Sequence, residues 1–249
     1  MRVIARLDIK GPNLIKGLQL EGLRVIGDPN QYAIKYYNQG ADELLFIDCV
    51  ASLYGRNNLI NIINHASQDI FIPVTVGGGI RKIEDAENLF LNGADKIAIN
   101  SAAIRKPSLI NDLVKNFGSQ AVVVSIQAKK IDENKWNAYL DNGRENSGKE
   151  IIDWLNEVAS RGAGEILVTS VDNDGTKNGF DLKLYDKINK NCNIPLIISG
   201  GMGKPEDLLS LNNFNDCDAV AVGTILHYDF SKISEIKEIA IKNKINGED

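Results

Sequence analysis

The chain has 249 residues, of which 43% are hydrophobic and 24% charged, a composition that suits one sizeable core and a single domain of the α/β-barrel size class. Its 28 Lys and Arg residues against 33 Asp and Glu residues give a formal net charge of −5. This balance argues against a protein that binds nucleic acid or a membrane surface through a broad positive field.

Short, nearly continuous apolar runs alternate with longer amphipathic segments along the whole chain, as is typical of buried parallel strands and the helices that cover them. The predicted strands span residues 3–8, 43–48, 72–76, 96–99, 122–127, 165–169, 194–199 and 219–222. The predicted helices span residues 31–39, 56–66, 82–92, 107–117, 150–161, 182–190, 204–211 and 231–245. Eight such units predict a single (β/α)8 TIM barrel.

The two halves of the chain repeat one another. The predicted strands at 3, 43, 72 and 96 are spaced almost as those at 122, 165, 194 and 219, and the stretch 72–79 resembles the stretch 194–201. We therefore predict one closed barrel built from two half-barrels, at about residues 1–119 and 120–249. Four strands alone would leave unpaired sheet edges.

Two long connections follow the first predicted strand of each half. Residues 10–28 carry several glycines and few helix signals, and residues 128–149 contain a short hairpin over 136–140 that turns at 141–143. Both connections are expected at the carboxyl ends of the strands, where barrel enzymes carry out their chemistry. Long loops at that position favour lids over the substrate.

Glycines and small polar residues end four of the predicted strands. Such residues let backbone N–H groups approach an anion closely, and a following helix amino terminus adds a favourable dipole. Tight strand-to-helix turns would explain one such pair, but pairs in both halves favour two phosphate-binding sites on one mouth. The first site contains Gly78, Gly79, Asn100 and Ser101, and the second contains Gly200, Gly201, Gly223 and Thr224.

Carboxylates also end predicted strands. Asp8 ends the first strand as a charge within an apolar run, Asp48 ends the second, and Asp174 follows the sixth, so each is a candidate general acid or base. The repeat places Gln127 opposite Asp8 in the second half, and an amide has no proton to exchange near neutral pH. The role of Asp48 stays open between catalysis and hydrogen bonding to neighbouring groups.

Charged residues begin four of the strands, at the opposite rim. Two cations and two anions at this rim can pair around the barrel axis: Arg2, Glu43, Lys96 and Glu165. From the pattern alone such a ring favours stability, with a gate as the alternative. The three cysteines lack metal-ligand spacing, so we predict no metal site and a reducing, cytoplasmic location. Charges within residues 1–8 disfavour a signal peptide.

Taken together, these motifs resemble the HisF family, the cyclase subunit of imidazole glycerol phosphate synthase, over essentially the whole chain. The matching stretches are 7–10, 40–48, 76–81, 93–100 and 162–176, of which 172–176 is particularly specific. The resemblance implies a heterodimer with a HisH-like glutaminase on the bottom face, which Asp95 contacts. Ammonia then passes the charged ring and travels through the barrel to the mouth.

The resemblance also implies a small bis-phosphorylated substrate and no cofactor. The two glycine-rich sites would hold its phosphates, with Gly175 beside the second. Lys16 matches a lysine of the family's mobile first loop, and further substrate contacts fall on Asp48, Thr169 and Ser199. Two aspartates carry out the acid–base chemistry in the family; Asp8 matches the first, whereas Gln127 stands at the position of the second, with Asp174 nearby.

The Gln127 substitution predicts slow cyclisation, and Arg6 stands where the family commonly has a small residue. Stretches 6–13 and 50–56 resemble a HisF-like branch that supplies ammonia to a separate enzyme amidating surface-polysaccharide sugars, and we expect that function. Three alternatives remain. The first is the histidine-pathway cyclase, in which ammonia and the ribulosyl aminoimidazole carboxamide substrate give imidazole glycerol phosphate. The others are a non-catalytic barrel that activates a glutaminase and a related sugar-phosphate isomerase.

Overall fold

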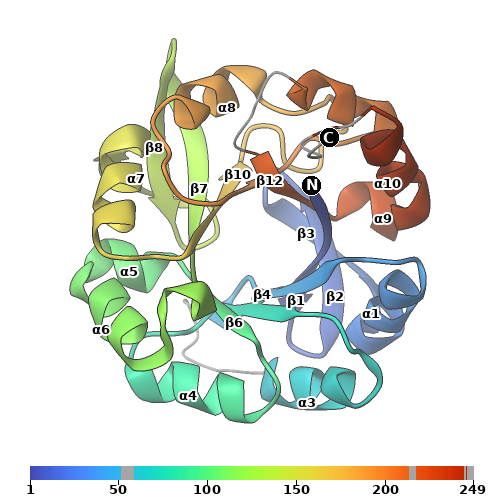
Figure 1. The fold of residues 1–249 in the computed structure, drawn as a ribbon, viewed down its shortest axis with the longest axis horizontal. Coiled ribbons are helices and arrows are strands. Elements are labelled where there is room, and N and C mark those ends of the chain that lie inside the picture. The colour runs from blue at the N-terminus through green and yellow to red at the C-terminus, as the bar shows by residue number, and fades with distance from the viewer. Residues whose placement is uncertain (52–58, 213–216, 244, 246–249) are drawn as a thin grey trace.

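The computed structural model describes residues 1–51, 59–212, 217–243 and 245, and these form a (β/α)8 barrel (Figure 1). Eight parallel strands run in the order β10, β11, β12, β1, β4, β5, β6, β7, and a pairing between β7 and β10 closes the barrel. The barrel strands are β1 (Arg2–Lys10), β4 (Glu43–Asp48), β5 (Val74–Gly77), β6 (Lys96–Ile99), β7 (Val122–Asp132), β10 (Glu165–Ser170), β11 (Leu196–Ser199) and β12 (Cys217–Val222). The predicted fold class is confirmed.

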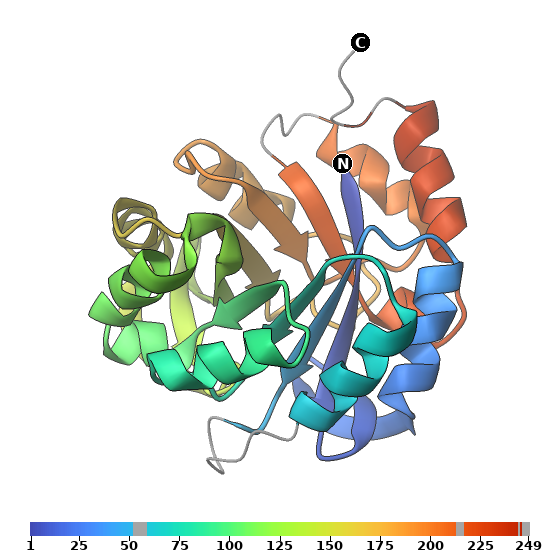
Figure 2. The ribbon, with the colours of Figure 1, turned by 60° about the horizontal axis from the view of Figure 1, so that its bottom comes forward.

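Helices surround the strands on the outside of the barrel (Figures 1 and 2). The longer helices are α1 (Pro29–Asn38), α3 (Leu59–Asp69), α4 (Ile83–Leu91), α6 (Ser108–Phe117), α7 (Ile151–Ser160), α8 (Leu182–Asn189) and α10 (Ile233–Lys242). The shorter ones are α5 (Ser101–Arg105), α9 (Thr224–His227) and the 3-10 helices η1 (Ser119–Ala121) and η2 (Pro205–Leu211). No described helix is long and apolar enough to cross a membrane.

Several predicted boundaries are corrected by the structure. Two barrel strands begin two residues later than predicted, at Val74 and Leu196, because Pro73 and Pro195 lack the N–H that a ladder requires. The last barrel strand begins two residues early, at Cys217. The segment 204–211, predicted to be α-helical, is the 3-10 helix η2. The beginning of the predicted helix 56–66 and part of the stretch 50–56 lie outside the described residues.

Both long connections form antiparallel hairpins, and their role as lids stays a prediction. After β1, β2 (Asn13–Leu18) and β3 (Glu21–Gly27) pair with each other, and β2 also pairs with β1. Their turn places Gln19 and Leu20 at positive φ, the conformation that two-residue hairpin turns favour. The hairpin lies at the end of the barrel opposite the amino terminus (Figure 2).

The second connection contains the predicted turn at 141–143 within a larger ribbon. Strand β7 continues to Asp132 and pairs with β8 (Lys135–Leu140), which in turn pairs with β9 (Glu145–Glu150). Both ribbons therefore extend barrel strands beyond the carboxyl-end rim, where they can support groups at the mouth.

Two apolar layers hold the barrel together. Because strand side chains alternate between faces, one layer packs between strands and helices, and the other fills the barrel interior. The interior layer consists of Ile4, Leu45, Ala98, Val123, Leu167, Ile197, Ala219 and Ala221. The position two residues after Ile4 is Arg6, so a charged side chain stands directly above this apolar layer.

Candidate active site at the carboxyl-end mouth

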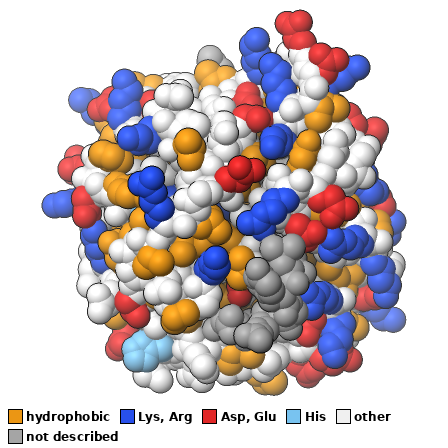
Figure 3. All heavy atoms as spheres, turned by 180° about the vertical axis from the view of Figure 1, so that it is seen from behind, with side chains coloured by type: hydrophobic (Ala, Val, Ile, Leu, Met, Phe, Trp, Pro, Cys, Tyr) orange, Lys and Arg blue, Asp and Glu red, His pale blue; other side chains and the backbone are white. Residues whose placement is uncertain are grey.

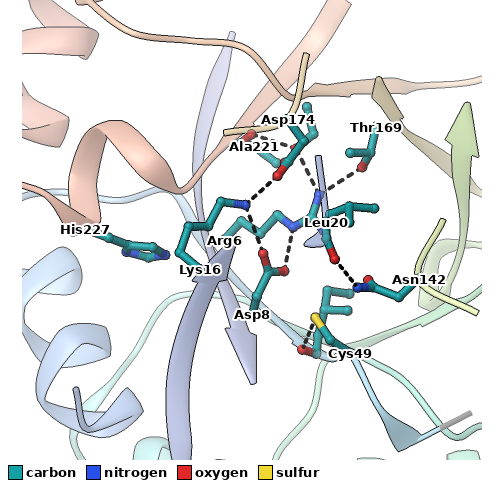
Figure 4. A network of polar contacts seen from close by, with 12 residues as sticks. Arg6, Asp8, Lys16, Leu20, Cys49, Asn142, Thr169, Asp174, Ala221 and His227 are labelled. Carbon is teal, nitrogen blue, oxygen red and sulfur yellow. Dashed lines mark hydrogen bonds and ion pairs between the residues drawn. The ribbon is translucent and has the colours of Figure 1, made fainter. Parts of the chain in front are cut away.

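Asp8 lies at the centre of a buried polar cluster (Figure 4). Strand periodicity directs Arg6 and Asp8 to the same, inner face of β1. The Arg6 Nε donates to Asp8 Oδ1 at 2.9 Å, and the Lys16 Nζ donates to Asp8 Oδ2 at 3.1 Å. Each of the three side chains is only 3% exposed, so the carboxylate is shielded by its two cations.

The first hairpin delivers Lys16 to this cluster. Its Nζ also donates to Asp174 Oδ1 at 2.8 Å, so one ammonium bridges two carboxylates. The Gln19 backbone N–H donates to the Asp174 carbonyl at 2.8 Å, which fastens the hairpin turn to the connection after β10. Gly175 permits this approach, because a Cβ there would lie 2.5 Å from the Gly17 carbonyl oxygen.

Charge pairing fixes the protonation states of the cluster. Burial alone would raise the pKa of Asp8, but the Arg6 and Lys16 cations outweigh burial and hold it well below its ordinary value. Burial opposes the charge of Lys16, yet Asp174 and Asp8 raise the pKa of its ammonium. Asp8 is therefore a carboxylate at neutral pH and cannot donate a proton there.

Arg6 spans the barrel above its apolar interior. Its Nη1 donates to Thr169 Oγ1 on β10 at 2.9 Å (Figure 4). The same Nη1 donates to Ser199 Oγ on β11 at 3.2 Å. The two hydroxyls predicted to contact substrate are thus occupied by an arginine. Of the predicted substrate-contacting residues, only Lys16 lies on the first connection, whereas Asp48, Thr169 and Ser199 lie within the last two residues of barrel strands.

Gln127 is held by the turn between β8 and β9. Its Oε1 accepts a hydrogen bond from the Gly143 backbone N–H at 2.7 Å. Gln127 is 7% exposed and lines a cavity of about 270 Å³ at the mouth. An amide in this position can orient a ligand but cannot exchange a proton with it.

The first predicted phosphate site surrounds the same cavity. All four of its predicted residues line that cavity: Gly78, Gly79, Asn100 and Ser101. Gly78 and Gly79 have positive φ, and a Cβ at Gly78 would lie 2.5 Å from the Asp48 carbonyl oxygen. Arg81, Arg105 and Lys106 line the cavity as well and supply positive charge for an anion.

The second predicted phosphate site is also assembled, but it is nearly filled. Its cavity of about 20 Å³ is close to the size of one water molecule, and Arg6 and Lys16 form part of its wall. The predicted residues that line it are Gly175, Gly200, Gly201, Gly223 and Thr224. The two sites therefore differ sharply in the space they offer, although the repeat makes them equivalent in sequence.

Asp48 differs from the other carboxylates of the mouth. Its Oδ1 accepts hydrogen bonds from the Val50 and Ala51 backbone N–H groups, each at 2.9 Å. Its Oδ2 is buried, and no described group donates a hydrogen bond to it. Burial raises the pKa of Asp48 above its ordinary value, against the effect of the two backbone donors.

The charged residues of the opposite rim form the ring that the sequence indicates. Arg2 pairs with Glu43 at 3.0 Å and also with Glu165, while Lys96 pairs with Glu43 at 2.9 Å and with Glu165 at 3.1 Å. Cations and anions thus alternate around the axis, with both glutamates almost fully buried. The pairing is confirmed, whereas a gating role stays a prediction.

Asp95 is exposed at the same rim, and its Oδ2 accepts a hydrogen bond from the Val74 backbone N–H at 2.8 Å. In the same way, Asp42 Oδ2 accepts a hydrogen bond from the Val3 backbone N–H, and Asp218 Oδ2 accepts one from the Leu196 backbone N–H, each at 2.8 Å. Asp95 therefore supports the start of a strand through one oxygen. Its contact with a partner stays a prediction.

Sequence reasoning identified the residues of the mouth but missed how they are connected. Arg6 was noted only as unusual, although its spacing of two from Asp8 on a strand already predicts a shared face. Asn142 lines the first cavity and donates from Nδ2 to the Leu20 carbonyl at 3.3 Å, a contact between the two hairpins that no local pattern shows.

Seen from the carboxyl-end side, acidic and basic side chains are mixed around the rim (Figure 3). The fold and this site define a (β/α)8 barrel with two glycine-rich turns and a buried cluster of paired carboxylates and cations at its mouth. A family model described as histidine biosynthesis protein matches residues 2–231. A protein of Legionella pneumophila named imidazole glycerol phosphate synthase subunit HisF is 57% identical over 207 residues, covering 83% of this chain and 98% of that protein.

Proteins with the same name in Bacillus cereus strain Q1 and Helicobacter hepaticus are 43% and 44% identical, each over 236 residues, or 95% of this chain and 94% and 93% of theirs. The chain therefore belongs to the HisF family. The expected assignment to a polysaccharide-amidation branch is wrong: these relatives are named as imidazole glycerol phosphate synthase subunits, which supports the histidine-pathway alternative.

Proposed function

We propose that this chain is the ammonia-using cyclase subunit of an imidazole glycerol phosphate synthase. The observation that carries the proposal is the placement of two elements on one barrel axis. The alternating ring of Arg2, Glu43, Lys96 and Glu165 closes one end, and the polar mouth with its two anion-binding turns forms the other. The names of the relatives support the same reaction.

In this proposal a glutaminase subunit docks at the amino-end rim and releases ammonia toward the charged ring. Ammonia crosses the apolar interior and reaches the mouth, where it reacts with a bis-phosphorylated ribulosyl aminoimidazole carboxamide. One phosphate occupies the roomy first site. The second phosphate requires Lys16 and its hairpin to move, because the second cavity as it stands holds about one water molecule.

The test has two arms. Purified chain is given ammonium and the bis-phosphorylated substrate, and formation of imidazole glycerol phosphate is followed. The second arm replaces ammonium by glutamine and the glutaminase subunit. We expect product in both arms, and product in neither arm would refute the proposed function. Product with ammonium but not with glutamine would keep the cyclase and refute the docked glutaminase.

A further inference from the structure

The first cavity extends from the rim of the mouth down into the barrel. Asn100 and Gln127 line it, and so do Ala98 and Ser125, which come two residues earlier on β6 and β7. Two residues of strand rise by roughly 6–7 Å, so Ser125 lies about that much deeper than Gln127 on the same face of β7. Ala98 belongs to the apolar interior layer, and Ser125 pairs in register with Leu167 of that layer. The cavity is therefore a pit whose floor is the interior of the barrel.

Ser125 presents a hydroxyl without a partner to this floor. The residue is only 8% exposed, and its Oγ makes no side-chain hydrogen bond with any other described residue. The atom is nevertheless not sealed from the cavity, because it is absent from the fully inaccessible polar atoms of the described chain. Burying a hydroxyl without a hydrogen bond is unfavourable. The floor thus holds a donor and acceptor that a bound ligand can satisfy.

The polar groups above Ser125 are uncharged. Gln127 is oriented by the Gly143 backbone N–H, which donates to its Oε1 at 2.7 Å, and its Nε2 can donate to a ligand oxygen. Asn100 and Asn142 also line the cavity, and each donates from Nδ2 to a backbone carbonyl. These contacts fix the amides in place, so the middle of the pit is a preformed, neutral hydrogen-bonding wall.

The rim of the pit is cationic. The cations that line it come from the connections beyond the strand ends: Arg81, Arg105 and Lys106. Arg105 pairs with Asp141, whereas Lys106 forms no ion pair with any described residue. Asp48 is the one carboxylate among the described lining residues, and two backbone N–H groups hold its Oδ1. An anionic group therefore binds at the rim, and the part of the ligand that enters the pit is uncharged.

The second cavity is separate from this pit. No described residue lines both cavities. The two cations that line the second cavity, Arg6 and Lys16, are already paired with the carboxylates of Asp8 and Asp174. Its space of about 20 Å³ holds about one water molecule. A ligand with a single anionic group is thus complete in the first cavity and needs no movement of the first hairpin.

From this arrangement we propose that the first cavity is a complete site for the phosphate monoester of a small sugar or polyol, with its phosphate at the rim and a hydroxyl on Ser125 Oγ. The inference goes beyond the proposed function, whose substrate carries two phosphates. A ligand hydroxyl both donates and accepts, so it matches the Ser125 hydroxyl and the Gln127 amide, whereas an apolar group would leave Ser125 unpaired. The volume of about 270 Å³ lies just below the range of about 300–1,000 Å³ for drug-sized ligands, which favours a compact ligand.

Calorimetric titration with ribose 5-phosphate, ribose and inorganic phosphate tests the site. We expect one ribose 5-phosphate per chain, bound at least about tenfold more tightly than either fragment. Ser125→Ala should weaken ribose 5-phosphate by about 3–10-fold, the effect of one hydrogen bond, and change inorganic phosphate less than about twofold. Lys106→Ala should weaken both phosphates by similar factors. The matched control is Ser160→Ala, an exposed serine of α7, which should bind as the wild type does.

A second measurement needs no variant. On addition of ribose 5-phosphate to the wild type, backbone amide chemical shifts should change at Gly79, Ser101 and Ser125 and stay constant at Gly201 and Thr224. Equal affinities for ribose 5-phosphate and inorganic phosphate, an unchanged affinity in Ser125→Ala, or shifts of equal size at Thr224 would each overturn the inference.

These outcomes are distinct from failure of the proposed function. A chain that binds ribose 5-phosphate but forms no imidazole glycerol phosphate from ammonium and the bis-phosphorylated substrate refutes the proposed function alone. A chain that turns over that substrate but does not bind ribose 5-phosphate refutes this inference alone.

Discussion

Replacing Asp8 by Asn should destabilise the barrel, and the buried cluster sets the size of the effect. The substitution removes the charge that two buried cations share, at 2.9 Å from Arg6 and 3.1 Å from Lys16. Breaking a buried pair by removing one partner typically costs about 3–5 kcal/mol. Lys16 keeps Asp174 at 2.8 Å, and Arg6 keeps two hydroxyl partners, so we expect about 3 kcal/mol.

Urea unfolding followed by tryptophan fluorescence and by circular dichroism measures this loss as a lower midpoint at unchanged slope. Asp186→Asn is the matched control, because it removes an exposed ion pair with Lys190 and should cost at most about 0.5 kcal/mol. A loss below about 1 kcal/mol for Asp8→Asn would show that Arg6 and Lys16 do not depend on this carboxylate.

The wild type and Asp8→Asn also test the pKa of Asp8. Its folded pKa lies below its unfolded value of about 3.9, so the stabilisation by ionised Asp8 is fully present above that pH and is lost as pH falls toward the folded pKa. The stability difference between wild type and Asp8→Asn should therefore narrow below about pH 4. A difference that stays constant down to pH 2.5 would refute the lowered pKa.

Other sites give further predictions. Lys96→Ala should break the charged ring and lower the product formed per glutamine hydrolysed, while activity with added ammonium is retained; unchanged coupling would make the ring purely structural. A strained backbone conformation alone costs about 1–3 kcal/mol. Gly201→Ala should cost more than this in urea unfolding, because a Cβ at φ +104° would also lie 2.0 Å from the Gly179 carbonyl oxygen. Titration with inorganic phosphate should show tighter binding at the Ser101 site than at the Thr224 site, whose cavity is nearly filled; equal affinities would contradict this.

The barrel was predictable because its signal is repeated and local. Each strand is an apolar run followed by an amphipathic segment, and the spacing of the two halves agrees. The first hairpin was not, because its turn at Gln19 and Leu20 lacks the Asn or Gly that normally marks positive φ, whereas the turn at 141–143 in the second connection contains both and was predicted. The small second cavity could not be predicted either, since it depends on how Arg6 and Lys16 cross the closed barrel.

The functional prediction was correct at the level of the family and wrong at the level of the branch. It gave two positions, Arg6 and Gln127, more weight than the resemblance to the family over essentially the whole chain, which the family model now matches over residues 2–231. Arg6 pairs with Asp8, and Gln127 accepts a hydrogen bond from the Gly143 backbone N–H, so both residues are part of the polar mouth. Two unusual residues therefore do not by themselves assign the chain to a different pathway.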